Sequence, residues 1–279
     1  MATSWPAPMP WPRRDDDGPV RGRFTFLDQA TPIAFAHRGG AADGFENTAR
    51  AFNHATGLGY HYLETDVHAT ADAVLVAFHN ASLDGVTDGH GAIASLPWAE
   101  VAQARVRGSE PIPRLDDLLR QFPHARFNLE PKADGAVDPL ITLLRQLDAV
   151  GRVCVTSFKG ARVRRLRAAL GNQLCTATGP LTLARMRLAS WLPLGPLSRL
   201  VARTPAGCAQ VPVRFRFVPI VDARFVRLAH RIGVQVHVWT INDRAEMEQL
   251  LDLGVDGIMT DDLELLKTVL QARGMWVDA

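Results

Sequence analysis

The stretch that decides the fold runs from Ala34 to Asn80 and reads AFAHRGGAADGFENTARAFNHATGLGYHYLETDVHATADAVLVAFHN. Its polar residues stand at the ends or edges of short apolar runs, and those that can carry chemistry are His37, Arg38, Glu46, Asn47, Glu64, Asp66 and His79. Two histidines, one arginine and three carboxylates gathered in this way indicate a metal-assisted reaction on a phosphate ester. The rest of the chain is expected to be the scaffold for this site.

Apolar runs of four to six residues alternate along the chain with longer segments of helical period. This alternation is typical of βα units that build a parallel sheet. Nine runs are candidate strands, namely Ile33–His37, Tyr62–Val67, Val74–Phe78, Arg126–Glu130, Val153–Thr156, Gln173–Ala177, Cys208–Val211, Val234–Trp239 and Gly257–Thr260.

Chain length decides which of these runs is surplus to a closed barrel of eight strands. Only six residues separate Val67 from Val74, whereas a parallel crossover needs about a dozen. The run Val74–Phe78 is therefore expected to be an excursion after the second strand. Helices are expected between the remaining strands and after the last one, over Asn47–Thr56, Arg114–Gln121, Val137–Leu147, Ala161–Leu170, Leu181–Val201, Asp222–Arg231, Asp243–Leu253 and Leu263–Gln271.

These elements predict an α/β protein with a single (β/α)8 TIM barrel over residues 31–279 and a short insertion after the second strand. An open, doubly wound sheet is the structural alternative. Residues 1–30 are expected to be a flexible tail, because the first nineteen contain five prolines, mixed charge and no periodicity. This opening has no apolar core of a secretory signal, and the chain has no apolar run long enough to span a membrane.

The three cysteines Cys154, Cys175 and Cys208 are an odd number scattered through apolar runs. We interpret them as reduced core residues rather than as a redox or metal site. A cytoplasmic location follows from this interpretation.

The net charge of +2 conceals a strong asymmetry. From Arg152 to Arg231 the chain has fifteen Lys and Arg residues against one acid, Asp222. One part of the surface is therefore expected to attract anions, with an ordinary solvated positive face as the alternative. Nucleic-acid binding is not expected, because no aromatic residues are interleaved with the basic ones in a recognition motif.

Glu64 and Asp66 are two residues apart in a predicted strand, so both carboxylates lie on the same face. In a barrel wall that face is the interior, where two unpaired negative charges are costly. A divalent cation offsets them, and Glu130 on another predicted strand supplies a third oxygen ligand. An all-oxygen set favours Mg²⁺ or Ca²⁺ over zinc.

His37 follows an apolar strand and opens the sequence His-Arg-Gly-Gly, in which the glycines permit close approach to a ligand and Arg38 can bind a phosphate with two hydrogen bonds. His79 closes another apolar run, and two histidines can divide general acid and base catalysis at neutral pH. Lys132, two residues beyond Glu130, is expected to point to the same side and to neutralise a phosphate oxygen.

The order of motifs resembles the glycerophosphodiester phosphodiesterase family. The motifs are HRG, ENT, E-x-D-V with a T-x-D turn, V-x-x-H, N-x-E-x-K, S-F, W-T-x-N and G-I-x-T-D, and they extend from about residue 33 to residue 262. The resemblance implies a (β/α)8 barrel, a divalent cation, and hydrolysis of glycerophosphodiesters to an alcohol and glycerol 3-phosphate.

The resemblance also implies the role of each matched residue. Glu64, Asp66 and Glu130 are expected to be metal ligands, and His37 and His79 the general acid and base. Arg38 and Lys132 are expected to bind phosphate. The remaining matches are Glu46 and Asn47, beside the metal or the substrate hydroxyls, and Trp239, which is expected either to pack on glycerol carbons at the pocket mouth or to fill the core.

Two positions depart from the family pattern. Asn80 stands where the family has an aspartate after V-x-x-H, and Gly85 replaces an arginine. Neither change removes an expected ligand or proton carrier, so activity with an altered substrate preference is expected. The insertion that lies over the pocket in this family has one helical run here, Leu96–Val106, which predicts a short and less restrictive lid.

The segment from Leu181 to Arg203 combines many apolar residues with four arginines and no acid. This composition suits an element on an anionic membrane surface, and packing against the barrel is the alternative. With a lipid surface the protein is expected to be membrane-peripheral and its substrate to be a lysophospholipid rather than a soluble glycerophosphodiester. Two further alternatives to the soluble phosphodiesterase therefore stay open, a lysophospholipase D and a catalytically silent barrel that binds phosphodiesters.

Overall fold

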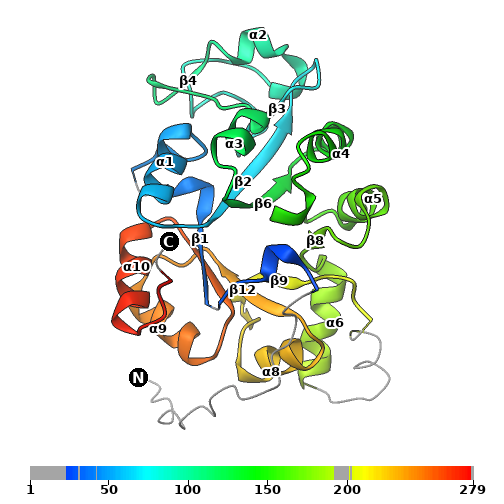
Figure 1. Ribbon diagram of the computed structural model, residues 1–279, viewed down its shortest axis with the longest axis vertical. Coiled ribbons are helices and arrows are strands. Elements are labelled where there is room, and N and C mark those ends of the chain that lie inside the picture. Colours follow the sequence, from blue (N-terminus) through cyan, green and yellow to red (C-terminus); the bar gives the residue numbers. More distant parts are fainter. Residues whose placement is uncertain (1–22, 31, 42, 192–200, 202, 278–279) are drawn as a thin grey trace.

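A ring of eight parallel strands forms the centre of the molecule (Figure 1). The computed structural model describes residues 23–30, 32–41, 43–191, 201 and 203–277. In spatial order the strands are β8 (Cys175–Thr176), β7 (Val153–Val155), β6 (Arg126–Pro131), β2 (Tyr62–Ala69), β1 (Ile33–Ala36), β13 (Gly257–Thr260), β12 (Gln235–Trp239) and β9 (Cys208–Pro212). A parallel bridge between Ala177 and Cys208 joins the two ends of this order. The predicted (β/α)8 barrel is thus confirmed, and the open sheet is excluded.

Helices surround the strands, as Figure 1 shows. They are α1 (Ala49–Gly57), α3 (Leu115–Gln121), α4 (Val137–Gln146), α5 (Gly160–Leu170), α6 (Pro180–Trp191), α8 (Ala223–Arg231), α9 (Arg244–Asp252) and α10 (Leu263–Ala272). Asp222, Asp243 and Asp262 accept hydrogen bonds from the first turns of α8, α9 and α10, which fixes where these helices begin.

One helix prediction needs correction, and another is tested only in part. Helix α1 begins after Asn47, because Thr48 is the residue whose hydroxyl caps it, and Asn47 has a left-handed backbone (φ 57°) that no helix tolerates. Helix α6 confirms the first part of the expected segment Leu181–Val201, over the described residues Pro180–Trp191. The remainder of that segment up to residue 200 lies outside the described residues.

The predicted excursion is confirmed. Strand β3 (Leu75–Ala77) pairs antiparallel with β2, with Val67 opposite Ala77. The insertion that follows contains the short helices η3 (Ile93–Ser95) and α2 (Trp98–Val101) and the paired strands β4 (Arg105–Val106) and β5 (Glu110–Pro111). It has a small core of its own, formed by Val76, Phe78, Leu83, Ile93, Val101, Ala104, Val106 and Ile112. The expected helical run Leu96–Val106 shrinks to the four residues of α2.

The end of the expected tail is part of the barrel. Phe24, Phe26 and Leu27 are fully buried, the last two within the short helix η1 (Thr25–Leu27). They pack against the barrel strands, and the hydroxyl of Tyr62 donates a hydrogen bond to the carbonyl of Phe26 at 2.6 Å. Gly207 makes room for this contact, since a Cβ there would lie 2.8 Å from Leu27 Cδ1 and from Phe24 Cδ2. The domain boundary therefore lies before Phe24, and residues 1–22 are outside the described part of the chain.

The three cysteines are buried and form no disulfide, and their sulfur atoms all lie within 4.8 Å of one another. They lie on the neighbouring strands β7, β8 and β9 beside Phe24 and Leu27. The sulfurs of Cys154 and Cys208 are 3.8 Å apart. They fill the core at the end of the barrel that is closed by η1.

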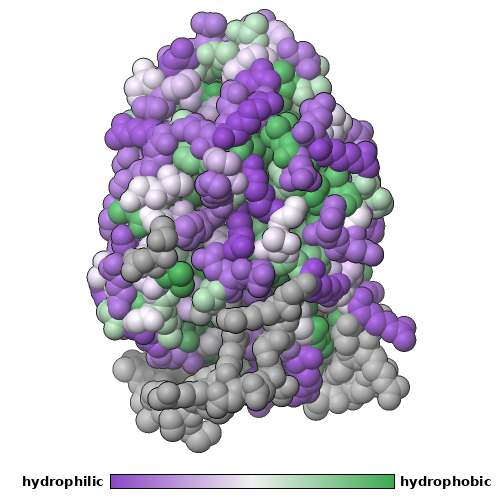
Figure 2. Space-filling view, viewed as in Figure 1, coloured by the Kyte–Doolittle hydropathy of each residue, from purple (hydrophilic) through white to green (hydrophobic). Residues whose placement is uncertain are grey.

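Hydrophilic residues dominate the face seen in Figure 2, and hydrophobic residues show on it in small groups. Most large apolar side chains are buried between the strands and the helices or inside the barrel. None of the helices in the described ranges is both long and apolar enough to span a lipid bilayer.

Candidate active site

A cavity of about 670 Å³ opens at the carboxyl ends of the barrel strands. In parallel barrels this is the end at which loops from every strand converge. Eight of the ten residues predicted for the site line this cavity, namely His37, Arg38, Glu64, Asp66, His79, Glu130, Lys132 and Trp239. Glu46 and Asn47 lie just behind it and contact Arg38 and Asp66.

Three carboxylates converge on one wall. Glu64 and Asp66 are both buried on β2, and the register of β2 and β6 sets Asp66 directly beside Glu130. Burial raises the pKa of Glu64 to about 7, with a further contribution from the negative charge of Asp66. Burial also raises the pKa of Glu130, against the opposing effect of Lys132. The buried site therefore disfavours the charged form of Glu64 and of Glu130.

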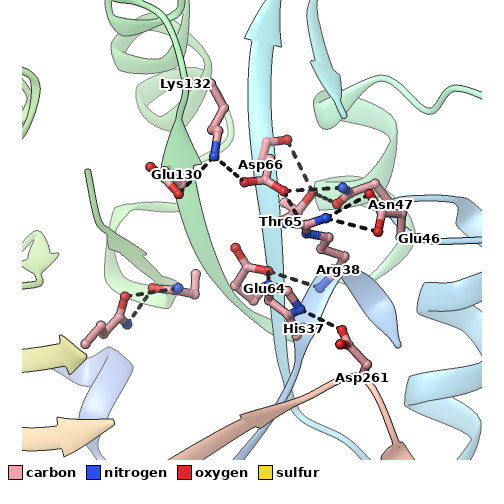
Figure 3. Close-up of polar contacts among 12 residues, drawn as sticks. His37, Arg38, Glu46, Asn47, Glu64, Thr65, Asp66, Glu130, Lys132 and Asp261 are labelled. Atoms are coloured by element: carbon pink, nitrogen blue, oxygen red, sulfur yellow. Dashed lines mark hydrogen bonds and ion pairs between the residues drawn. The ribbon is translucent and has the colours of Figure 1, made fainter. Parts of the chain in front are cut away.

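Two basic side chains lie among the carboxylates (Figure 3). Lys132 Nζ is 3.2 Å from Asp66 Oδ1 and 3.3 Å from Glu130 Oε2. Arg38 Nε forms an ion pair with Asp66 Oδ2 at 3.2 Å. The predicted direction of Lys132 is correct, because strand β6 continues through Pro131.

The turn after β1 presents Arg38 to the site. Arg38, Gly39 and Gly40 all have positive φ angles, at 54°, 80° and 95°. A Cβ at Gly39 would lie 2.9 Å from the ring of Phe52, so only glycine fits there. The turn directs the backbone N–H of Arg38 to Glu64 Oε2 at 3.0 Å. The left-handed backbone of a non-glycine residue is of the kind found at ligand sites.

Glu46 and Asn47 hold Arg38 and Asp66 in position. Arg38 Nη1 donates to both carboxylate oxygens of Glu46, at 2.9 and 3.0 Å. Asn47 Nδ2 donates to Asp66 Oδ2 at 3.4 Å, and its Oδ1 accepts a hydrogen bond of 2.7 Å from Thr65. The amide and the carboxylate thereby fix the side chains of Asp66 and Arg38.

His37 is held by a partner that the sequence analysis did not assign. Its Nδ1 is 2.7 Å from Asp261 Oδ1, and its Nε2 is 3.8 Å from Glu64 Oε2. Burial alone lowers the pKa of His37, but the hydrogen bond to Asp261 and the negative charges of Glu64 and Asp261 outweigh it, so the pKa is raised. The signal in the sequence was the aspartate of the motif G-I-x-T-D after β13.

His79 reaches the cavity from the end of the excursion. Its backbone carbonyl accepts a hydrogen bond from His68 Nε2 at 3.2 Å, and its Nδ1 is 2.9 Å from Asn80 Oδ1. Because an amide oxygen can only accept, Nδ1 is the protonated nitrogen in this arrangement. Asn80 therefore orients His79 as a carboxylate would, without the charge.

The comparison with known proteins identifies the chain. The model of the glycerophosphoryl diester phosphodiesterase family matches residues 37–265. The chain belongs to this family. It is a phosphodiesterase and thus a hydrolase, as the order of motifs predicted.

Individual relatives are consistent with this family assignment. "Probable glycerophosphodiester phosphodiesterase 2" of Mycobacterium tuberculosis is 38% identical over 256 residues, which cover 90% of this chain and 95% of that protein. "Lysophospholipase D GDPD1" of Mus musculus is 26% identical and covers 84% and 85% of the two chains. The structure of an Oleispira antarctica phosphodiesterase in complex with the product sn-glycerol-3-phosphate superposes with a TM-score of 0.71 at 21% identity, covering 86% of this chain and 97% of that one. That superposition supports the barrel fold.

The opposite wall of the phosphodiesterase cavity is apolar, and apart from Trp239 its residues were not predicted. It is formed by Phe158, Pro180, Leu183, Ala184, Pro212, Phe215, Ile220 and Trp239. These residues come from the loop after β7, from helix α6, from the end of β9 and the segment that follows it, and from the end of β12. Trp239 touches Phe158 edge to face, with ring centroids 6.2 Å apart.

The expected lid over the phosphodiesterase cavity needs correction. Among the described residues of the insertion from Phe78 to Arg114, His79 is the one that lines the cavity. The insertion packs its apolar residues on β3 and into its own core instead. The cavity is therefore shaped by the loops on the far side of the barrel.

Proposed function

We propose that this phosphodiesterase hydrolyses glycerophosphodiesters to an alcohol and glycerol 3-phosphate in a metal-dependent reaction, with His37 and His79 as general acid and base. The observation that carries the proposal is the convergence of three carboxylates, two basic side chains and two histidines in one cavity. A phosphodiester needs this set, because charge develops on its oxygens while protons move at the nucleophile and the leaving group.

The carboxylates fit a divalent cation. Glu64, Asp66 and Glu130 offer oxygen atoms only, and burial raises the pKa of Glu64 and of Glu130. Such a donor set suits Mg²⁺ or Ca²⁺. When bound, the cation supplies positive charge to the phosphate oxygens. Lys132, already between Asp66 and Glu130, is free to shift toward the phosphate once the carboxylates have another counter-charge.

The histidines are oriented for proton transfer. With Nδ1 of His37 held by Asp261 and Nδ1 of His79 held by Asn80, the Nε2 atom of each ring is the one left to exchange a proton. Arg38 and Lys132 bind phosphate, with Asn47 and Trp239 beside the glycerol.

A metal-titrated assay on glycerophosphocholine tests the proposal. We expect turnover with added Mg²⁺ or Ca²⁺ and loss of it with a chelator. His37→Ala, His79→Ala and Glu64→Ala are each expected to lower kcat/KM by about 10²- to 10⁴-fold. His90→Ala is the matched control, since His90 is exposed on the insertion, pairs with Asp84 and is not among the residues that line the cavity. Near-normal turnover in the His37 or Glu64 variant would contradict the proposed metal-dependent acid–base mechanism.

A second candidate is a lysophospholipase D activity at a membrane surface. The observation that favours it is the apolar wall, which offers an acyl chain a path beside the polar one. A relative named a lysophospholipase D supports the same substrate class. Leu183→Ala is expected to lower turnover of lysophosphatidylcholine and to leave that of glycerophosphocholine within about twofold. Equal losses on both substrates would argue against the candidate.

The alternative of a catalytically silent barrel loses its main argument. It rested on Asn80 and Gly85, yet Asn80 keeps the hydrogen bond to His79. Gly85 has φ 77°, with no atom within 4 Å of a Cβ placed there, so the missing arginine leaves an open turn. A cytoplasmic, membrane-peripheral location remains a prediction.

A further inference from the structure

A small hairpin beside the cavity exposes aromatic side chains. Strands β10 (Arg214–Phe215) and β11 (Val218–Pro219) pair antiparallel, with Arg214 opposite Pro219 and Phe215 opposite Val218. Phe217, in the turn between them, is 94% exposed, and Phe215 is 62% exposed. A turn usually carries polar residues. Two phenylalanines in water here indicate a surface that something else covers.

The exposed apolar residues line the cavity or lie on elements that line it. Phe215 and Phe158 line the cavity and still leave 62% and 68% of their surface in water. Helix α6 lines it with Leu183, Ala184 and Arg187, and its other side is exposed at Leu181, Leu188 and Trp191. The hairpin, Phe158 and α6 thus form one apolar rim, which we call the mouth rim.

Positive charge accompanies the mouth rim. Arg214 and Arg216 lie in the hairpin, and Arg185 lies on α6. Arg216 is 5.9 Å from the ring of Phe215. The acid in the sequence between Arg152 and Arg231 is Asp222, and it is paired with Arg187 at 2.6 Å. Its charge is therefore already matched, and Arg185, Arg214 and Arg216 are exposed to solvent.

We propose that the mouth rim docks the phosphodiesterase on an anionic lipid bilayer, with the cavity facing the membrane. Exposed aromatic and aliphatic side chains enter the interface between head groups and acyl chains, while arginines pair with anionic head groups. The positive charge is complementary to this surface and repels a second, equally basic copy of the chain. The inference rests on the second candidate of the proposed function in one respect, that the substrate is a lysophospholipid delivered through this mouth.

Sedimentation of the full chain with vesicles tests the docking without any turnover. Vesicles of phosphatidylcholine mixed with phosphatidylglycerol are expected to bind the protein at low salt, and vesicles of phosphatidylcholine alone to bind it much less. Phe217→Ala is expected to weaken binding by about tenfold. Replacing Arg214 and Arg216 together with Gln is expected to remove the preference for phosphatidylglycerol. Met275→Ala, an exposed apolar residue of the C-terminal segment, is the matched control and is expected to bind as the wild type does.

Turnover of glycerophosphocholine in vesicle-free buffer is the second readout. Phe217 does not line the cavity, so Phe217→Ala is expected to keep wild-type turnover of this soluble diester. The docking is overturned if the wild-type protein does not bind anionic vesicles. It is also overturned if the Phe217→Ala variant binds them as strongly as the wild type. The docking is also overturned if the wild-type protein does not bind vesicles but self-associates, and if Phe217→Ala abolishes this self-association. The mouth rim would then be an interface with a second copy of the chain. If the wild-type protein does not turn over glycerophosphocholine, the proposed function is contradicted. The vesicle sedimentation still tests the docking in that case, because it does not depend on turnover.

Discussion

His37 Nδ1 and Asp261 Oδ1 lie 2.7 Å apart although 224 positions separate the residues. The contact exists because β1 and β13 are neighbours in the barrel, with Ala36 beside Thr260, so both side chains leave the same end. Asn242 holds the aspartate, donating from Nδ2 to Asp261 Oδ2 at 2.9 Å and accepting from the Asp261 N–H at 2.9 Å. The imidazole is thereby fixed before substrate binds.

Asp261→Asn is expected to lower kcat by about 10- to 100-fold with little change in KM, because the amide keeps the shape and loses the charge. Asp261 helps to raise the pKa of His37, so its removal moves that pKa down. The limb of the pH–kcat profile that depends on His37 is expected to shift to lower pH. Steady-state kinetics across the pH range measure both effects.

Asp243→Asn serves as the control for this variant. Asp243 caps helix α9, and its Oδ1 accepts from the N–H of Glu246 at 2.9 Å without contact to the cavity. Asparagine is an equally good cap, so wild-type kinetics are expected. If Asp261→Asn kept the wild-type kcat and pH profile, the aspartate would have no part in positioning His37.

Asn80 yields a separate prediction about His79. Asn80→Asp keeps an acceptor for His79 Nδ1, whereas Asn80→Ala removes it. Turnover of glycerophosphocholine is expected to stay within about threefold in the aspartate variant and to fall about tenfold or more in the alanine variant. Equal activity of the two variants would mean that the ring of His79 is held by other contacts.

The sequence predicted the barrel because buried parallel strands read as short apolar runs, and all eight appear in the structure. Loop length also identified β3 as an excursion, since the six residues before it are too few for a crossover. The predicted end of the tail at residue 30 was too late for a local reason. Phe24, Phe26 and Leu27 form less than one periodic turn, and only the closed barrel reveals the hole that they fill.

The polar half of the site was predictable because most of its residues lie in a strand or directly after one, and barrel geometry brings these strands together. The apolar half was not. Phe158, Leu183 and Phe215 come from two loops and a helix with no shared motif, and only their placement makes them one wall. The contact of Asp261 with His37 was missed for the same reason, since it depends on which strands close the barrel.

Metal binding is expected to depend on pH through Glu64. Its pKa of about 7 means that a proton occupies the metal-free carboxyl below neutrality, and a cation has to displace it. Affinity for Ca²⁺ is therefore expected to fall as the pH drops below 7 and to level off above it. Calorimetry at several pH values, in buffers of different ionisation enthalpy, measures both the affinity and the proton released. An affinity that is constant from pH 6 to 8 would rule this out.

Tyr60 provides a test of the fold at alkaline pH. The chain has two tyrosines, Tyr60 and Tyr62, both buried, and burial raises the pKa of each phenol. In the unfolded chain a tyrosine loses its proton near pH 10. The folded state keeps it, so the free energy of unfolding falls above pH 10 by about 1.4 kcal/mol per pH unit for each tyrosine.

Tyr60→Phe removes one of these two contributions. The variant also loses the hydrogen bond from the hydroxyl to the carbonyl of Leu263 at 2.8 Å, which is expected to cost about 1 kcal/mol at pH 8. Above pH 10 its stability is expected to decline less steeply than that of the wild type, so the two curves approach each other. Urea unfolding from pH 8 to pH 11 measures the difference, in which the titration of lysines common to both proteins cancels. Parallel curves would mean that Tyr60 ionises as readily in the folded barrel as in the unfolded chain, and that the Leu263 contact does not bury the phenol.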